Sequence, residues 1–181
     1  MTFSKRPSVF FALLALLAIT RVGHFGTAVS LPDASLAVFL MGGLWLGGAR
    51  CFAAYAVTAF GIDVFLAKSA VEAGWCLTPA YGGLVASYGV MWLAGRFLAR
   101  TPALPPLRLA GVGAPAVLTA FSVANLSFWA FSGYFGDMSA MDYAASVLKY
   151  LPPYLGSTAL YLALGWVALY LARTRISATR A

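Results

Sequence analysis

Six apolar stretches, separated by short polar segments, constrain the fold of this chain more than any other feature. A helix needs about 20 mostly apolar residues to cross the hydrocarbon core of a membrane. The chain is 62% hydrophobic and 9% charged over 181 residues, whereas soluble domains carry about 25% charged residues. We therefore predict an all-α, polytopic membrane protein with one domain over residues 1–181. Its six expected helices are Val9–Thr20, Ala34–Gly48, Cys51–Ala67, Pro79–Leu98, Leu109–Phe131 and Tyr154–Ala172.

The first apolar stretch has two interpretations. Lys5 and Arg6 followed by an apolar run are also typical of a cleaved signal peptide. The sequence Thr20-Arg21-Val22-Gly23 is a poor match to the small residues of a cleavage site. We interpret the stretch as a membrane-spanning helix, although charge sorting alone does not exclude cleavage.

The basic residues indicate an orientation. With six spans, nine of them fall on one side of the membrane: Lys5, Arg6, Arg50, Arg96, Arg100, Arg108, Arg173, Arg175 and Arg180. Only Arg21, Lys68 and Lys149 fall on the other side. Positively charged residues concentrate in cytoplasmic loops, so we expect both termini in the cytoplasm.

The acidic residues gather on the opposite, outer side in this topology. All five are expected there: Asp33, Asp63, Glu72, Asp137 and Asp142. The single histidine, His24, and one of the two cysteines, Cys76, join them. Ordinary loop hydration explains such residues too, and we prefer it for Asp33 and Glu72. The remaining side chains predict an outward-facing site.

Cys76 lies in the stretch VEAGWCLTPAYGG, just ahead of an expected helix start. Thr78 is a suitable N-cap and Pro79 a suitable first helical residue. The positive end of a helix lowers the pKa of a nearby thiol and raises its thiolate fraction. Cys51 is expected a full span away and cannot form a disulfide with Cys76. A small apolar filler is the alternative for either cysteine.

Three further side chains are candidates for the same site. Asp63 is an ionisable residue within a span, which marks a functional position by default. A purely structural ion pair of Asp63 with Lys68 or Arg21 is the alternative. Tyr81 and Tyr88 are seven residues apart and share one helix face.

The long segment between the last two spans predicts a short outer helix. Ser139 and Asp142 resemble a capping box, so we expect a helix over Ala140–Leu151 that ends at Pro152–Pro153. Its many aromatic residues are typical of a lid over the site or of an interfacial belt. Both interpretations remain open.

Several kinds of chemistry lack their motifs here. The sequence has no Gly-x-Ser-x-Gly elbow, no Walker A loop for ATP and no nucleic-acid-binding motif. One histidine cannot build a His-rich metal cage. A soft thiolate with an imidazole suits a transition metal or a metal-bearing cofactor.

The chain resembles the substrate-binding S-components of energy-coupling factor (ECF) transporters, and among them the BtuM-type cobalamin transporters. The likeness rests on Asp63 and on the Gly-Trp-Cys-Leu-Thr-Pro-Ala-Tyr stretch that ends at Tyr81, with His24 before them and Lys149 after them. It implies corrinoid uptake across a bacterial inner membrane through a pocket that faces the periplasm. It also implies reductive removal of the cobalt's upper ligand, such as cyanide.

The resemblance assigns roles residue by residue. Cys76 is implied to be an axial ligand to the cobalt of cobalamin, with Asp63 and Tyr81 close by. His24 is implied to contact the ligand or to steady the pocket wall, and Tyr88 to line the pocket. Lys149 departs from the arginine of the family, and lysine lacks the bidentate fork of arginine.

Partners and alternatives also follow from the sequence. The lipid bilayer is an expected partner, and an energising module is a further one. The first span has alanines spaced by three rather than four, at Ala12, Ala15 and Ala18, which favours solitary action. An S-component for another vitamin or a metal ion, a membrane thiol enzyme that uses Cys76 as nucleophile, and a structural subunit remain alternatives.

Overall fold

The computed structural model describes residues 7–22, 31–69, 77–101 and 104–178, and every regular element in these ranges is helical. The expected all-α fold is confirmed. The elements are α1 (Pro7–Val22), α2 (Ser35–Trp45), α3 (Ala49–Ser69), α4 (Tyr81–Leu98), α5 (Pro106–Phe131), α6 (Ala140–Val147), the short 3₁₀ helix η3 (Leu148–Tyr150) and α7 (Leu151–Ala178).

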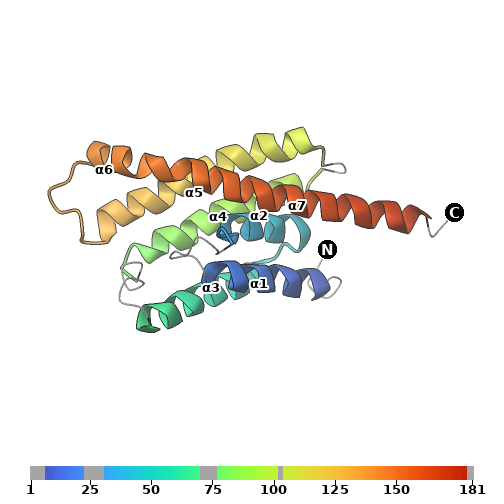
Figure 1. Ribbon diagram of the computed structural model, residues 1–181, viewed down its shortest axis with the longest axis horizontal. Coiled ribbons are helices and arrows are strands. Elements are labelled where there is room, and N and C mark those ends of the chain that lie inside the picture. Colours follow the sequence, from blue (N-terminus) through green and yellow to red (C-terminus); the bar gives the residue numbers. More distant parts are fainter. Residues whose placement is uncertain (1–6, 23–30, 70–76, 102–103, 179–181) are drawn as a thin grey trace.

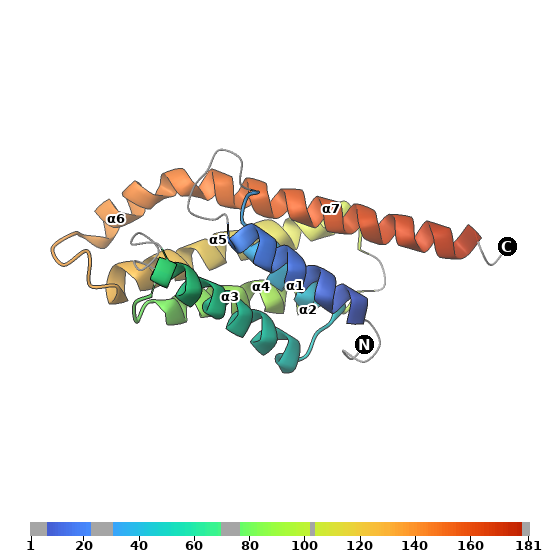
Figure 2. The same ribbon diagram turned by 60° about the horizontal axis from the view of Figure 1, so that its bottom comes forward.

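The long helices run alternately in opposite directions along the bundle (Figure 1). One end therefore carries the C-terminal ends of α1, α3 and α5 together with the N-terminal ends of α2, α4 and α7. We call this the network end, after the polar contacts described below. α6 lies at the same end and continues through a bend into α7, which extends beyond the other helices at the opposite end (Figure 2).

Helix α2 forms the centre of the bundle. Nine consecutive residues, Ser35–Gly43, are buried, although the helix has only 11 residues. At 1.5 Å per residue, α2 is about 16 Å long, too short to cross a bilayer alone. Its continuous burial shows that neighbouring helices, rather than lipid, surround it.

Three helical stretches of the described chain are long and apolar enough to cross a membrane: Ala49–Lys68, Pro106–Phe131 and Ala140–Leu171. Pro7–Arg21 and Ser35–Trp45 are apolar but shorter. These stretches indicate a membrane protein. The arrangement of six complete spans stays a prediction.

Glycines bring α2 and α4 into close contact. A Cβ atom on Gly43 would collide with the backbone carbonyl of Trp92, and one on Gly95 would collide with the carbonyl of Leu40. Gly95 is therefore a helix-packing residue of α4. Small residues allow helix backbones to approach in this way.

Two glycine substitutions on α4 are expected to differ in their effect on stability. Gly95→Ala should destabilise the protein by about 1–3 kcal/mol, because the collision is with backbone and the helices must separate. Gly89→Ala meets nothing within 4 Å and should be neutral or stabilising, by up to about 1 kcal/mol, through helix propensity. Unfolding in detergent micelles measures both. Equal destabilisation by the two substitutions would contradict this packing.

The segment before α7 confirms one expectation and corrects another. Ser139 caps α6, accepting a hydrogen bond from the backbone N–H of Asp142 at 3.2 Å. The expectation that Pro152–Pro153 ends the helical segment is wrong, because α7 begins at Leu151 and includes both prolines. Proline is tolerated in a first turn, where the backbone needs no N–H donors.

Candidate functional site

A buried ion pair between Arg21 and Asp63 forms the centre of the network end. Arg21 lies in the last turn of α1, where a cation favours the negative end of the helix dipole. Its Nε donates to Asp63 Oδ1 at 2.7 Å and its Nη2 donates to Asp63 Oδ2 at 2.5 Å. The two side chains are 6% and 9% exposed. Of the two structural partners that the sequence offered for Asp63, the structure selects Arg21.

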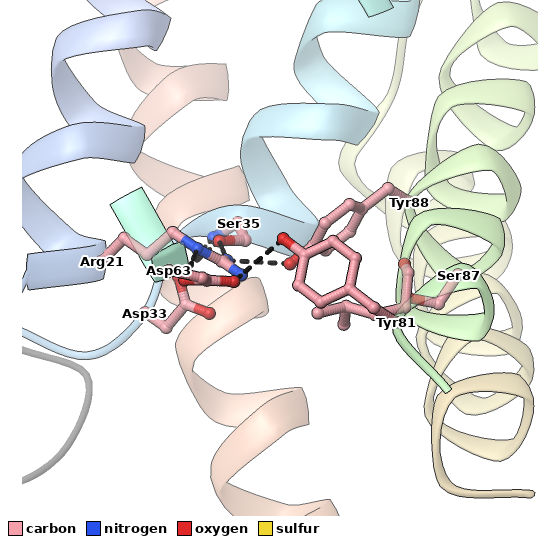
Figure 3. A network of polar contacts seen from close by, with 8 residues as sticks. Arg21, Asp33, Ser35, Asp63, Tyr81, Ser87 and Tyr88 are labelled. Carbon is pink, nitrogen blue, oxygen red and sulfur yellow. Dashed lines mark hydrogen bonds and ion pairs between the residues drawn. The ribbon is translucent and has the colours of Figure 1, made fainter. Parts of the chain in front are cut away.

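The guanidinium also reaches α2 and α4. Its Nη1 donates to the hydroxyl oxygens of Ser35 and Tyr88, each at 2.8 Å. Figure 3 shows the Arg21 side chain extended between Asp63 on one side and the α4 tyrosines on the other. One cation therefore connects four helices: α1, α2, α3 and α4.

The Tyr81 hydroxyl donates a further hydrogen bond to Asp63 Oδ2 at 2.9 Å (Figure 3). Asp63 thus accepts three hydrogen bonds, which is how a buried carboxylate is satisfied. Asp33 accepts from the Ser35 hydroxyl at 2.6 Å. The described parts of the network are extensively hydrogen-bonded, with two carboxylates near one guanidinium.

Packing fixes the positions of the two tyrosines. The ring of Tyr88 stacks on Phe39 of α2, with centroids 4.3 Å apart and planes 6° apart. The ring of Tyr81 meets Phe60 of α3 edge-on at 5.1 Å. Their spacing of seven residues places both on one face of α4, as the sequence predicted.

A cavity of about 200 Å³ opens beside this network. Its polar wall comes from the residues just described, and its apolar wall comes mainly from α5. The described lining consists of Arg21, Asp33, Ser35, Leu36, Asp63, Ala80, Tyr81, Leu84, Ser87, Tyr88, Ala120, Phe121, Ala124, Asn125, Phe128 and Tyr154. The structure therefore brings together three of the predicted site residues, Asp63, Tyr81 and Tyr88.

The cavity is small. Pockets for drug-sized ligands occupy about 300–1,000 Å³, and a corrinoid is larger than such ligands. A corrin ring would fit only if the cavity widened or if part of the ring stayed outside it. Ala120 and Ala124 have small side chains, but α5 still limits the volume of the cavity on that side.

The lysine predicted for the site lies elsewhere. Lys149 is exposed on η3, with its ammonium group 5.1 Å from the ring centre of Tyr150. The described cavity lining contains no residue of α6 or η3. α6 instead packs on α5 through the buried Tyr143, whose hydroxyl donates to Asn125 Oδ1 at 3.3 Å. In this structure α6 contacts the cavity only indirectly, through Asn125.

Cys76 and His24 lie outside the residues that the structure describes, as does Glu72. The chain is described again from Leu77, and a turn precedes α4. The Tyr81 N–H donates to the Thr78 carbonyl at 2.9 Å. The expected N-cap role of Thr78 is wrong: its hydroxyl accepts from Ala80 within this turn at 3.3 Å, and α4 begins only at Tyr81.

The position of the other cysteine agrees with a role as a small apolar residue in the helix packing. Cys51 is buried near the start of α3, at the end of the bundle opposite the network. Within the described ranges, no group of three or more His, Cys, Asp or Glu residues could hold a metal ion.

Sequence reasoning missed the central role of Arg21. It entered only as an outer positive charge and as one of two possible structural partners for Asp63. The available signal was that the predicted topology places one arginine on its outer side and nine basic residues on its inner side. The network shows that this charge is buried within the protein rather than placed in a loop.

No protein-family model matches this chain, and no curated protein is significantly similar to it.

Proposed function

We propose that the chain is a membrane importer of corrinoids that binds cobalamin at the network end, with the Cys76 thiolate as an axial ligand to cobalt. The observation that carries this proposal is the direct contact between Asp63 and Tyr81. The resemblance places both in the ligand pocket, and in the structure their side chains share a hydrogen bond and line one cavity.

The cavity's two walls suit an amphipathic ligand. Phe121 and Phe128 on α5 offer apolar contact for a flat macrocycle. The opposite wall offers hydroxyl groups for polar substituents. Cys76 precedes Leu77 and Ala80 in the chain by one and four residues, and Ala80 lines the cavity. A thiolate near this point would meet a cobalt ion at the cavity mouth, and soft thiolate ligands suit transition metals.

In this proposal the protein lies in a bacterial inner membrane, with both termini in the cytoplasm and the network end facing the periplasm. Reductive removal of the upper ligand is the second activity of this proposal, and it requires an external reductant. The alanines of α1 are spaced by three residues rather than four, which favours solitary transport over transport with an energising module.

The cavity volume favours a second candidate, an importer of a smaller vitamin through the same site. Isothermal titration of the purified protein against cobalamin, riboflavin, thiamine and biotin separates the two candidates. Corrinoid import predicts binding of cobalamin alone. Binding of one of the smaller vitamins, without cobalamin, would support the second candidate.

Uptake in a cell that lacks other corrinoid importers tests the proposal in vivo. We expect the wild-type chain and Cys51→Ala to restore cobalamin-dependent growth, and Cys76→Ala to fail. Each strain is compared with and without an energising module, at matched membrane levels of the protein. Growth with Cys76→Ala equal to that of the wild type would contradict the proposed role of the thiol.

A further inference from the structure

The hydroxyl group of Tyr88 accepts a hydrogen bond but does not donate one to a described residue. Its oxygen accepts a hydrogen bond from Arg21 Nη1 at 2.8 Å. Its own hydrogen has no acceptor among the residues that the structure describes. The neighbouring Tyr81 differs, because its hydroxyl donates to Asp63. The Tyr88 hydroxyl is therefore a hydrogen-bond donor without an acceptor among the described residues, whereas its neighbours in the network are hydrogen-bonded.

This donor is both buried and fixed. Tyr88 is 2% exposed, lines the cavity and stacks on Phe39. A buried donor without a partner is unfavourable, and native proteins rarely keep one without a reason. The bond from the Arg21 cation also polarises the hydroxyl, because hydrogen bonds in a chain strengthen one another. The result is a strong donor at the polar wall.

Arg21 itself has little capacity left for a ligand. Its described bonds already go to Asp63, Ser35 and Tyr88. Because the Asp63 carboxylate balances its charge, Arg21 does not offer a free cation to an anionic ligand. Recognition of a ligand at this wall therefore falls to the hydroxyl that Arg21 polarises.

We infer that Tyr88 donates its hydroxyl hydrogen to the ligand, and that the part of the ligand inside the cavity carries an uncharged oxygen acceptor of the carboxamide or carbonyl class. Arg21 acts as the positioning residue for this donor. The inference rests on the proposed function for its ligand, since the corrin ring carries carboxamide groups around its edge. The competing explanation is a water molecule that fills the donor and plays no part in recognition.

Tyr88→Phe tests the inference, because it removes only the hydroxyl and keeps the ring that stacks on Phe39. Its matched control is Tyr55→Phe. Tyr55 is fully buried, and its hydroxyl donates to the Phe10 carbonyl at 3.1 Å, away from the cavity. Calorimetric titration with cobalamin and with the three smaller vitamins measures affinity. Thermal unfolding of the ligand-free proteins measures any structural effect.

We expect Tyr88→Phe to weaken cobalamin binding about 10-fold, the effect of one lost hydrogen bond, and Tyr55→Phe to leave affinity unchanged. Unchanged affinity in Tyr88→Phe, with cobalamin bound by the wild type, would overturn the inference and leave the proposed function intact. Binding of a smaller carbonyl-bearing vitamin, weakened by Tyr88→Phe, would support the inference and overturn corrinoid import. If the wild type bound none of the four compounds, both would fail.

Discussion

Arg21→Met is expected to destabilise the protein by about 3–5 kcal/mol. The substitution keeps much of the side-chain volume but leaves the Asp63 carboxylate buried without its cation, and uncompensated buried charges carry this cost. It also removes the bonds that join Ser35 and Tyr88 to the network. The effect is measured by unfolding the protein in detergent micelles and monitoring the loss of its helical circular dichroism signal.

A double substitution separates charge from packing. The double variant Arg21→Met/Asp63→Asn carries neither charge of the pair. We therefore expect it to recover much of the stability that Arg21→Met alone loses. Such coupling is what a double-mutant cycle measures for residues in contact. Arg50→Met, at an exposed position of the opposite end, should change stability by less than about 0.5 kcal/mol. Additive losses from Arg21→Met and Asp63→Asn would show that the pair is not coupled.

The second large effect is expected at Cys76. Under the proposed function, Cys76→Ala should weaken cobalamin binding by more than about 100-fold, because loss of groups that only support a metal ligand already costs 10–100-fold. Calorimetric titration measures the affinity. Folding should be unaffected, as judged by an unchanged thermal unfolding curve.

Cys51→Ala is the matched control for that experiment. It changes the chain's other cysteine, which is buried near the end opposite the cavity. We expect it to keep full cobalamin affinity, with at most a modest loss of stability. Equal weakening by both substitutions would indicate a general structural effect and not loss of a cobalt ligand.

The apolar stretches predicted where the long helices lie. The expected Val9–Thr20 and Leu109–Phe131 segments match α1 and α5 to within a few residues. The burial of α2 could not be predicted, because its apolar residues suit lipid and protein interior equally well. Whether such a helix is surrounded by protein depends on tertiary packing, here on the close approach of Gly43 and Gly95 to their neighbours.

The errors in local structure have physical causes. Thr78–Pro79 has the composition of a helix start, yet the chain forms a turn there and the helix begins at Tyr81. Pro152–Pro153 has the composition of a helix end, but prolines are equally suited to a first turn. In both cases proline suits two backbone roles, so its presence alone does not decide between them.

The site was predictable only in part. Asp63, Tyr81 and Tyr88 were identified because ionisable and aromatic residues near span ends are informative on their own. The choice of Arg21 as the partner of Asp63, 42 residues away, depends on how α1 and α3 pack. Lys149 was chosen for its positive charge and its place before the last span, but it lies on η3 beside Tyr150 and is not part of the described cavity lining.

The most direct measurement is the absorption spectrum of cobalamin during titration with the purified protein. A sulfur–cobalt bond changes the ligand field, so the corrin bands should shift with the wild type and with Cys51→Ala, and should stay unshifted with Cys76→Ala. Identical spectra with the wild type and Cys76→Ala, under conditions where calorimetry shows cobalamin bound, would contradict thiolate coordination and with it the central claim.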